Sequence, residues 1–384
     1  MITKFDSSYY GTADLENLGY EGTPINERRY PQEQFGKALR KVVSYAKCMD
    51  ERGFNTFWMA EHHFQPEGTE LIPNLLMMAM HLVNNTKNLK IGCGFNVVPM
   101  WHPLRLAEDY AMADILSGGR VIFGVARGYH TREVESFGSP LLDQNANREL
   151  FEESVDIIFK AFNNDSFSHE GKNYTIPARV PYRGYDLKDL TVVPRPLRLP
   201  VETWQPIVSA RPEAMDFMIK YGIRGMVGGG AATMDAGPVI AYRDAAARAG
   251  HDWQLGQNLG IGIHCYIGNS REEAVRRITP YYEEHVKMFG PLGFVPGITP
   301  QQLAASMRRG GWAEGGVPTV EHYMANGAWF AGSADEMVER LKGFEARYPG
   351  LETVNLSCSM GTPKEVMIEQ YHRIAEEIMP HFGK

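Results

Sequence analysis

The chain has 384 residues, enough for two average domains or for one large α/β domain. Its 43% apolar and 11% aromatic content supports a sizeable core and excludes wholesale disorder. The net charge of −7 is spread along the chain without a long basic run. This disfavours nucleic acid as the main partner, because neutralising phosphates requires a basic stripe.

The sequence predicts a soluble cytoplasmic protein. The first residues, MITKFDSSYYG, lack the apolar segment of a secretory signal, and the longest apolar stretch, Leu75 to Val83, is too short to span a bilayer. Four cysteines occur without CxxC spacing, namely Cys48, Cys93, Cys265 and Cys358. We expect free buried thiols in a reducing compartment, with metal binding or a disulfide as the alternative.

Helical and strand patterns alternate along the chain. The amphipathic stretch 32–51 predicts a helix that ends at Gly53, and residues 54–60 predict a strand. Further strands are predicted at residues 89–98, 121–126, 206–210, 222–227, 258–268 and 352–358, with a possible short first strand at 2–5. Further helices are predicted at residues 73–84, 103–116 and 147–162, after residue 210, at 239–249, from 271 to near 287, and at 363–379.

The predicted strands are nearly continuous apolar runs, which indicates burial on both faces and therefore a parallel sheet covered by helices. About eight such strand–helix units favour an α/β fold that closes as a (β/α)8 TIM barrel, with an open doubly wound sheet as the alternative. We predict one domain over residues 1–384. Two long insertions, near 164–205 and 289–320, are expected at the carboxyl-terminal face as lids or interface arms.

The stretch NTFWMAEHHF ends an apolar strand in Glu61, His62 and His63. Active sites of TIM barrels lie at the carboxyl ends of strands, so one histidine is predicted to be catalytic. Side chains alternate along a strand, so the two histidines should point in opposite directions and not form a joint metal site. A purely structural histidine pair is the alternative.

Two further strand ends carry candidate site residues. VARGYH ends in Arg127 and His130, where the arginine suits an anionic group such as phosphate and the histidine is a second catalytic candidate; a surface arginine would look the same. In VSARPEAMDF, Ala210 and Arg211 precede Pro212, which is well placed as the first residue of a helix. The free amides of that helix start, together with Arg211, could bind a phosphate.

Two glycine-containing segments suggest close approach of the backbone to a ligand. GCGF, which ends in Gly94 and Phe95, permits unusual backbone geometry at a strand end. The cluster from Gly225 to Met234 lacks the GxGxxG spacing of a dinucleotide site. It is more consistent with close packing, or with a loop against a flat ligand.

The stretches GFNTFWMAEHHF and LKIGCGFNVVPMWHPLRLAEDYAMADILSGGRVIFGVARGYH closely resemble the bacterial luciferase-like, flavin-dependent monooxygenases. In that family GFDxxWxxEHHF, HPxRxAEDxxxLDxxSxGR and FGxxRG recur in this order. The match is dense from Gly53 to about Phe162. It continues loosely to the carboxyl-terminal GSADEMVERL and MPHF. The resemblance implies a TIM barrel, in agreement with the count of strand–helix units.

The resemblance also implies roles for individual residues. His62 matches the family histidine beside the reacting flavin and substrate. Arg127 matches an arginine that contacts the flavin phosphate or ribityl chain, and Arg148 resembles a further phosphate ligand. Gly94 and Phe95 lie where the family often has an irregular, sometimes cis, peptide beneath the isoalloxazine ring.

The chain departs from the family at two places. Ala126 stands where some luciferases have a cysteine, so no thiol is present there to tune the flavin. The family's hydroxyl-rich phosphate loop is SARPEA in this chain, where Arg211 supplies charge in place of a serine. This second departure leaves the choice between FMN and the deazaflavin F420 open.

The function that the resemblance implies is a two-component monooxygenase. Reduced FMN from a separate reductase would react with O₂ to a C4a-(hydro)peroxyflavin that oxygenates a small organic substrate, with His62 as proton donor or acceptor. An F420- or flavin-dependent dehydrogenase or reductase and a non-catalytic flavin-binding protein are the alternatives. No metal is expected, the family suggests a homodimer or higher homo-oligomer, and the substrate cannot be read from the sequence.

Overall fold

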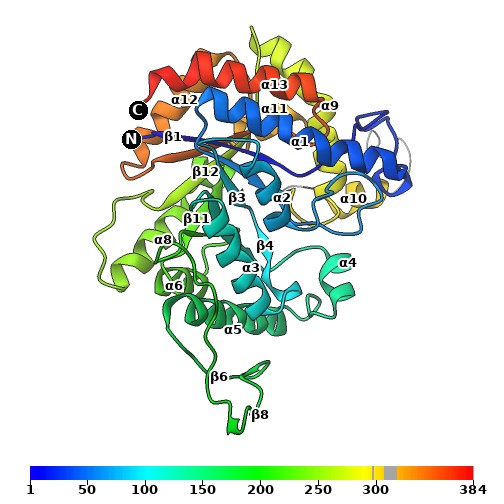
Figure 1. The fold of residues 1–384 in the computed structure, drawn as a ribbon. Helices are drawn as coiled ribbons and strands as arrows, with labels where there is room; N and C mark the ends of the chain where they lie inside the picture. The colour runs from blue at the N-terminus through cyan, green and yellow to red at the C-terminus, as the bar shows by residue number, and fades with distance from the viewer. Residues whose placement is uncertain (296–297, 307–317, 384) are drawn as a thin grey trace.

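In the computed structural model, which describes residues 1–295, 298–306 and 318–383, parallel strands close into a barrel covered by helices (Figure 1). Within these residues the barrel has eight strands: β1 (Lys4–Tyr9), β2 (Thr56–Met59), β3 (Lys90–Cys93), β5 (Val121–Ala126), β10 (Thr203–Ile207), β11 (Arg224–Gly228), β12 (Leu259–Ile267) and β14 (Thr353–Ser357). Each pairs with the next, and β14 pairs with β1. The predicted TIM barrel is therefore confirmed, and the alternative of an open sheet is excluded.

The helices that cover the barrel are α1 (Gln32–Arg52), α2 (Leu75–Val83), α3 (Pro103–Leu116), α5 (Gln144–Asn163), α6 (Pro212–Lys220), α8 (Gly237–Arg248), α12 (Ala334–Arg347) and α13 (Lys364–Arg373). Helix α5 begins earlier than predicted because the Asp143 carboxylate accepts hydrogen bonds from the first free amides. Helix α12 was not predicted, although Ser333 and Glu336 form the capping box that starts it.

The barrel strands are buried on both faces, as their apolar sequences predict. Every residue of β2 and of β14 is buried. Inside the barrel, Trp58, Ile122 and Trp204 form a cluster that partly buried Phe95 and Met226 extend towards the carboxyl ends of the strands. All four cysteines are free and buried, as expected. Among the described residues, none of the helices is long and apolar enough to cross a membrane.

The first insertion, residues 164–205, was predicted at the carboxyl-terminal face of the barrel, and this prediction is wrong because the segment lies at the amino-terminal face. It connects the end of α5 to the start of β10, which places it at the amino ends of the strands. Glu202 in this segment pairs with Lys90 and Arg224, which begin β3 and β11. The segment carries two small hairpins, β6 (His169–Glu170) with β7 (Thr175–Ile176) and β8 (Pro181–Tyr182) with β9 (Tyr185–Asp186), which project from the barrel (Figure 1). It therefore cannot form a lid over the carboxyl ends.

The second insertion belongs to a long excursion between β12 and α12. It contains α9 (Arg271–Phe289), α10 (Pro300–Ser306), α11 (Val320–Ala325) and β13 (Trp329–Gly332). The helix predicted from residue 271 is thus α9, which belongs to the excursion. The helix that covers the barrel between β12 and β14 is α12. Leu292 and Phe294 lie at the carboxyl ends of the strands, as predicted for this insertion. Residues 296–297 and 307–317 of the predicted range 289–320 lie outside the described residues.

Two histidines pack the excursion against the barrel. The rings of His264 on β12 and His285 on α9 are 4.9 Å apart, and both contact Trp329 of β13, at 4.8 and 5.1 Å. Burial lowers the pKa of His264 to about 4 and the pKa of His285 well below its ordinary value. Both imidazoles are therefore neutral at neutral pH.

A buried ion cluster fastens the segment after β1 to the same excursion. The Glu284 carboxylate on α9 accepts hydrogen bonds from the Arg28 guanidinium at 2.9 Å, from Lys287 Nζ at 2.8 Å and from the amide of Gly19 at 2.8 Å. All three charged side chains are almost fully buried. Removing the carboxylate would leave two buried cations without their anion.

We predict that Glu284→Gln lowers the free energy of unfolding by about 3–5 kcal/mol, because it breaks a buried ion pair while keeping the size of the side chain. The matched control is Glu376→Gln, which removes the exposed partner of Arg52 and should cost less than about 1 kcal/mol. Urea unfolding measures both. Equal losses in the two variants would contradict the role of the cluster.

We also predict that the free energy of unfolding decreases as the pH is lowered, because His264 and His285 are neutral in the folded state. A histidine in the unfolded chain has a pKa of about 6.5. Between that pH and about pH 4, the unfolded chain therefore binds more protons than the folded chain. The free energy of unfolding must then decrease as the pH falls through this window. His285→Phe should reduce that slope by up to about 1.4 kcal/mol per pH unit. An unchanged slope in denaturant titrations at several pH values would refute this.

Candidate functional site

Two adjoining cavities open at the carboxyl ends of the barrel strands. The inner cavity has a volume of about 340 Å³ and the outer cavity about 490 Å³. The residues that line both are Ala126, Gly128, Tyr129, Pro206, Val208 and Phe294. A third hollow, of about 360 Å³, lies at the amino ends of the strands around Lys4 and Arg224. It has no histidine or cysteine in its lining, so the two cavities at the carboxyl ends are the candidate site.

The inner cavity has aromatic walls supported by glycines. A Cβ on Gly92 would lie 2.2 Å from the Trp58 ring, so only glycine lets this indole pack flat against β3. Trp58 Nε1 donates a 2.8 Å hydrogen bond to the buried Asp6 carboxylate. The bond between Gly94 and Phe95 is a cis peptide, which confirms the predicted irregular geometry, and both residues line the inner cavity.

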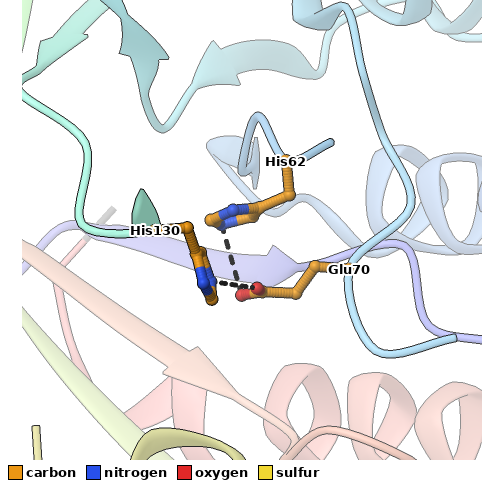
Figure 2. Close-up of side chains that lie close together, drawn as sticks. All are labelled: His62, Glu70 and His130. Atoms are coloured by element: carbon orange, nitrogen blue, oxygen red, sulfur yellow. Dashed lines mark hydrogen bonds and ion pairs between the residues drawn. The ribbon is translucent and has the colours of Figure 1, made fainter. Parts of the chain in front are cut away.

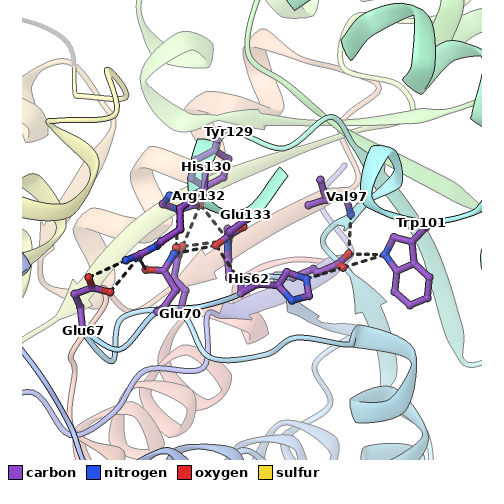
Figure 3. Close-up of polar contacts among 12 residues, drawn as sticks. His62, Glu67, Glu70, Val97, Trp101, Tyr129, His130, Arg132 and Glu133 are labelled. Atoms are coloured by element: carbon purple, nitrogen blue, oxygen red, sulfur yellow. Dashed lines mark hydrogen bonds and ion pairs between the residues drawn. The ribbon is translucent and has the colours of Figure 1, made fainter. Parts of the chain in front are cut away.

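His62 lies where the chain leaves β2, lines the inner cavity and is almost fully buried (Figure 3). Its Nδ1 is 3.3 Å from both carboxylate oxygens of Glu133. Its Nε2 is 3.1 Å from the Tyr129 hydroxyl and 3.2 Å from Glu70 Oε1. Both ring nitrogens therefore have polar partners in fixed positions.

His63 points away from His62, as strand alternation predicts. Its Nε2 is 3.1 Å from Glu61 Oε1, and its ring packs on Phe137 at 4.8 Å. The Glu61 carboxylate also accepts hydrogen bonds from the amide of Val97 at 2.7 Å and from Trp101 Nε1 at 2.9 Å. Figure 3 labels these two donors. Glu61, with His63 against it, thus joins the loop after β2 to the segment after β3.

His130 contacts Glu70 and lines neither cavity. Its Nε2 is 3.0 Å from Glu70 Oε2, and Glu70 Oε1 faces His62 (Figure 2). Glu70 Oε1 also accepts a 3.0 Å hydrogen bond from the Tyr129 hydroxyl. The two histidines predicted as catalytic therefore meet at one carboxylate. Only His62 reaches the inner cavity directly.

Two loops bring these side chains together. The amide of His62 donates to the carbonyl of Ile72, which folds the loop after β2 back so that Glu70 reaches the histidine. After β5 the chain turns at Gly128, whose φ of +82° lies in the left-handed region, and a Cβ there would lie 2.7 Å from Val134. The short helix α4 (Thr131–Val134) then presents Glu133 to His62.

The charges of this network shift the pKa values of its members. Burial lowers the pKa of His62, but the carboxylates of Glu70 and Glu133 outweigh it and the net shift is upward. Burial raises the pKa of Glu133, but the hydrogen bond and charge of His62 bring it below its ordinary value. Burial, followed by the charge of Glu70, raises the pKa of Tyr129 well above 10. The tyrosine is therefore a neutral hydrogen-bond donor.

The outer cavity is lined by basic side chains. Arg127 Nε donates to Asn147 Oδ1 at 2.7 Å and its Nη2 donates to the carbonyl of Gln144 at 2.9 Å, which fixes the guanidinium. Burial, and then the positive charges of Arg148 and Arg211, lower the pKa of Arg127. The Glu152 carboxylate, which lines the same cavity, opposes this effect. Positive charge gathered beside one cavity is what an anion site requires.

The start of α6 completes this basic wall. Pro212 is the first residue of the nine-residue helix, as predicted, and the helix start has no side-chain cap. Ser209 and Ala214 line the outer cavity, whereas Ala210 and Arg211 are exposed beside it. The buried Gln205 Oε1, next to the cavity, has no hydrogen-bond partner within the described structure. The helix amino end and the arginines supply donors and positive charge for a phosphate, whereas the free amide oxygen of Gln205 suits a hydroxyl donor elsewhere on the same ligand.

Sequence reasoning missed Glu70 and Glu133. Both are almost fully buried, yet each lies in a segment without a strand pattern or a recognised motif. The available signal was the density of acids after β2, where Glu61, Glu67 and Glu70 occur within ten residues. That spacing does not say which acid is buried.

The chain is similar to known flavin-dependent monooxygenases along most of its length. The family model described as luciferase-like monooxygenase matches residues 22–376. The oxygenase component of flavin-dependent trigonelline monooxygenase from Acinetobacter baylyi is 24% identical over 376 residues, 94% of each chain. The alkanal monooxygenase alpha chain of the Kryptophanaron alfredi symbiont is 31% identical over 147 residues, 38% of this chain and 40% of that one.

Solved structures share the fold over nearly the whole chain. The oxygenating constituent of 3,6-diketocamphane monooxygenase from Pseudomonas putida, in complex with FMN, has a TM-score of 0.68 at 18% identity and covers 99% of both chains. An F420-dependent secondary alcohol dehydrogenase in complex with an F420–acetone adduct has a TM-score of 0.66 at 14% identity and covers 100% of both. The predicted class of enzyme, a flavin-dependent monooxygenase, is confirmed. The chain belongs to the luciferase-like monooxygenase family.

Proposed function

We propose that this chain is the oxygenase component of a two-component monooxygenase that takes reduced FMN from a separate reductase and uses O₂ to oxygenate a small organic substrate. The observation that carries the proposal is the pair of adjoining cavities, one basic and one aromatic, with His62 in the aromatic one. The trigonelline relative, which is an oxygenase component, supports the need for a reductase.

The described residues fit a flavin mononucleotide that spans both cavities. Arg127, Arg148 and the amino end of α6 would hold its phosphate in the outer cavity. The flat ring would lie in the inner cavity against Phe95 and the cis peptide before it. When bound, a reduced flavin supplies the activation of O₂, which no amino-acid side chain can supply.

The protein then provides orientation, exclusion of water and proton transfer. Trp58, Phe95 and Phe294 line the inner cavity with apolar surface, which shields a reactive group from water. Two histidines, His62 and His264, line this cavity. Burial keeps His264 neutral, with a pKa of about 4, whereas His62 lies beside Tyr129 and would transfer a proton to or from the reacting molecule. His130 would act through Glu70.

An F420-dependent dehydrogenase is the second candidate function. The likeness to the F420-dependent alcohol dehydrogenase supports that candidate, as does the arginine in SARPEA where the family often has serine. The two functions differ in what the reduced cofactor does with O₂. A homodimer and a cytoplasmic location stay predictions.

We predict that Arg148→Met weakens binding of FMN by about 10- to 100-fold, the loss expected for a charged hydrogen bond to phosphate, and leaves riboflavin binding unchanged. Arg148 is the better target because Arg127 also supports the local fold. Flavin fluorescence titration measures both affinities.

The matched control for that titration is Arg105→Met on α3, an exposed arginine that lines neither cavity. It should bind FMN and riboflavin as the unchanged protein does. If Arg148→Met lowered the affinities for FMN and for riboflavin by the same factor, this arginine would not contact the phosphate.

We predict that reduced FMN, bound anaerobically and mixed with O₂ in a stopped-flow spectrometer, passes through a species that decays more slowly than reduced FMN reoxidises in free solution. The apolar inner cavity is the physical reason. Substrates should speed this decay without release of H₂O₂. Immediate reoxidation, combined with reduction of F420 by an alcohol, would instead establish the dehydrogenase.

A further inference from the structure

We infer that Glu70 and Glu133 are positioning residues that hold His62 as a doubly protonated imidazolium, with its Nε2 proton available to a molecule in the inner cavity. The charge state of His62 follows from the geometry of the resting protein. Only the use of the proton rests on the proposed function.

The Nδ1 side of the ring is fixed by Glu133. Its carboxylate accepts hydrogen bonds from the amide of His63 at 3.0 Å and from Gln65 Nε2 at 2.9 Å, and it lies 3.3 Å from His62 Nδ1. An ionised carboxylate can only accept hydrogen bonds. His62 Nδ1 must therefore carry a proton.

The Nε2 side is fixed through Tyr129 and Glu70. The tyrosine hydroxyl has one hydrogen, which it donates to Glu70 Oε1 at 3.0 Å. Its oxygen must then accept from its other neighbour, His62 Nε2, at 3.1 Å. A neutral imidazole would instead direct a lone pair at Glu70 Oε1, 3.2 Å away. This nitrogen therefore also carries a proton.

The remaining charged groups around His62 agree with a positive ring. Glu61, on the same segment, adds a further negative charge, while His130 donates to the far oxygen of Glu70. Arg132, the arginine of α4, is paired with Glu67 at 2.9 Å and does not neutralise Glu70 or Glu133 (Figure 3). A buried cation between two carboxylates is the arrangement that low polarity favours.

This arrangement makes His62 a proton donor in the resting protein. The Nε2–H bond breaks, the proton joins a basic atom of the molecule in the inner cavity, and the bonding electron pair stays on Nε2. Glu133 keeps the other proton on Nδ1, so the neutral ring retains one defined tautomer and orientation. Solvent water then returns a proton to Nε2.

The test is ¹⁵N NMR of the full chain with labelled histidine, because ring nitrogens of imidazolium and neutral imidazole have distinct shifts. The His62 signals are assigned by their loss in His62→Gln. We expect both nitrogens to be protonated at pH 7 in the unchanged protein. In Glu70→Gln and in Glu133→Gln the pKa of His62 should fall by about 1–3, since each removes one opposite charge.

Glu67→Gln is the matched control, because Glu67 is also buried in this loop but pairs with Arg132. It should leave the His62 pKa unchanged, and Glu133→Asp, which keeps the charge, should hold it above the value in Glu133→Gln. A neutral His62 at pH 7 in the unchanged protein, or equal shifts in the glutamine variants and the control, would overturn the inference.

Zn²⁺ is added in a separate titration, because His62, Glu70 and His130 have ligand atoms within 4.8 Å of one another. Loss of the His62 Nε2 proton at one equivalent of Zn²⁺, with the Nδ1 proton kept towards Glu133, would overturn the assignment of this cluster as a proton site. If the NMR results hold but reduced FMN does not react productively with O₂, the proposed function fails and the charge state of His62 stands.

Discussion

The parallel pairing of β1 with β14 joins the two ends of the chain, and the site depends on this closure. Once the barrel is closed, the carboxyl ends of strands that are distant in sequence meet at one rim. The inner cavity draws on this rim, with residues from all eight barrel strands or from the loops that follow them. The same closure separates the two insertions. The segment before β10 lies at the amino ends of the strands, and the excursion after β12 lies at the rim.

Buried carboxylates explain how the rim is organised. Glu61, Glu70 and Glu133 are almost fully buried, which is unfavourable for a charge unless donors surround it. Each has such donors: Glu61 binds the amide of Val97 and the Trp101 ring, and the other two enclose His62. These contacts hold the histidine in one position before any ligand arrives, so little rearrangement is needed when one binds.

The features that were predictable from sequence depend on local pattern. Apolar strand sequences predicted the barrel, strand alternation predicted that His62 and His63 diverge, and Pro212 correctly marked the start of α6. Glu70 and Glu133 were not predictable because their positions depend on how two loops fold back. The face of the barrel at which the first insertion lies could have been predicted from the order of the elements alone. A segment between a helix and the next strand lies at the amino ends of the strands.

The central claim is that a flavin spans the two cavities, with its phosphate at the arginines and its ring beside His62. A crystal structure of the protein with FMN tests this most directly. The account predicts electron density for the phosphate between Arg127, Arg148 and the start of α6, and for the ring against the Gly94–Phe95 peptide. Density for the flavin in the hollow at the amino ends of the strands, or with its phosphate remote from these arginines, would contradict it.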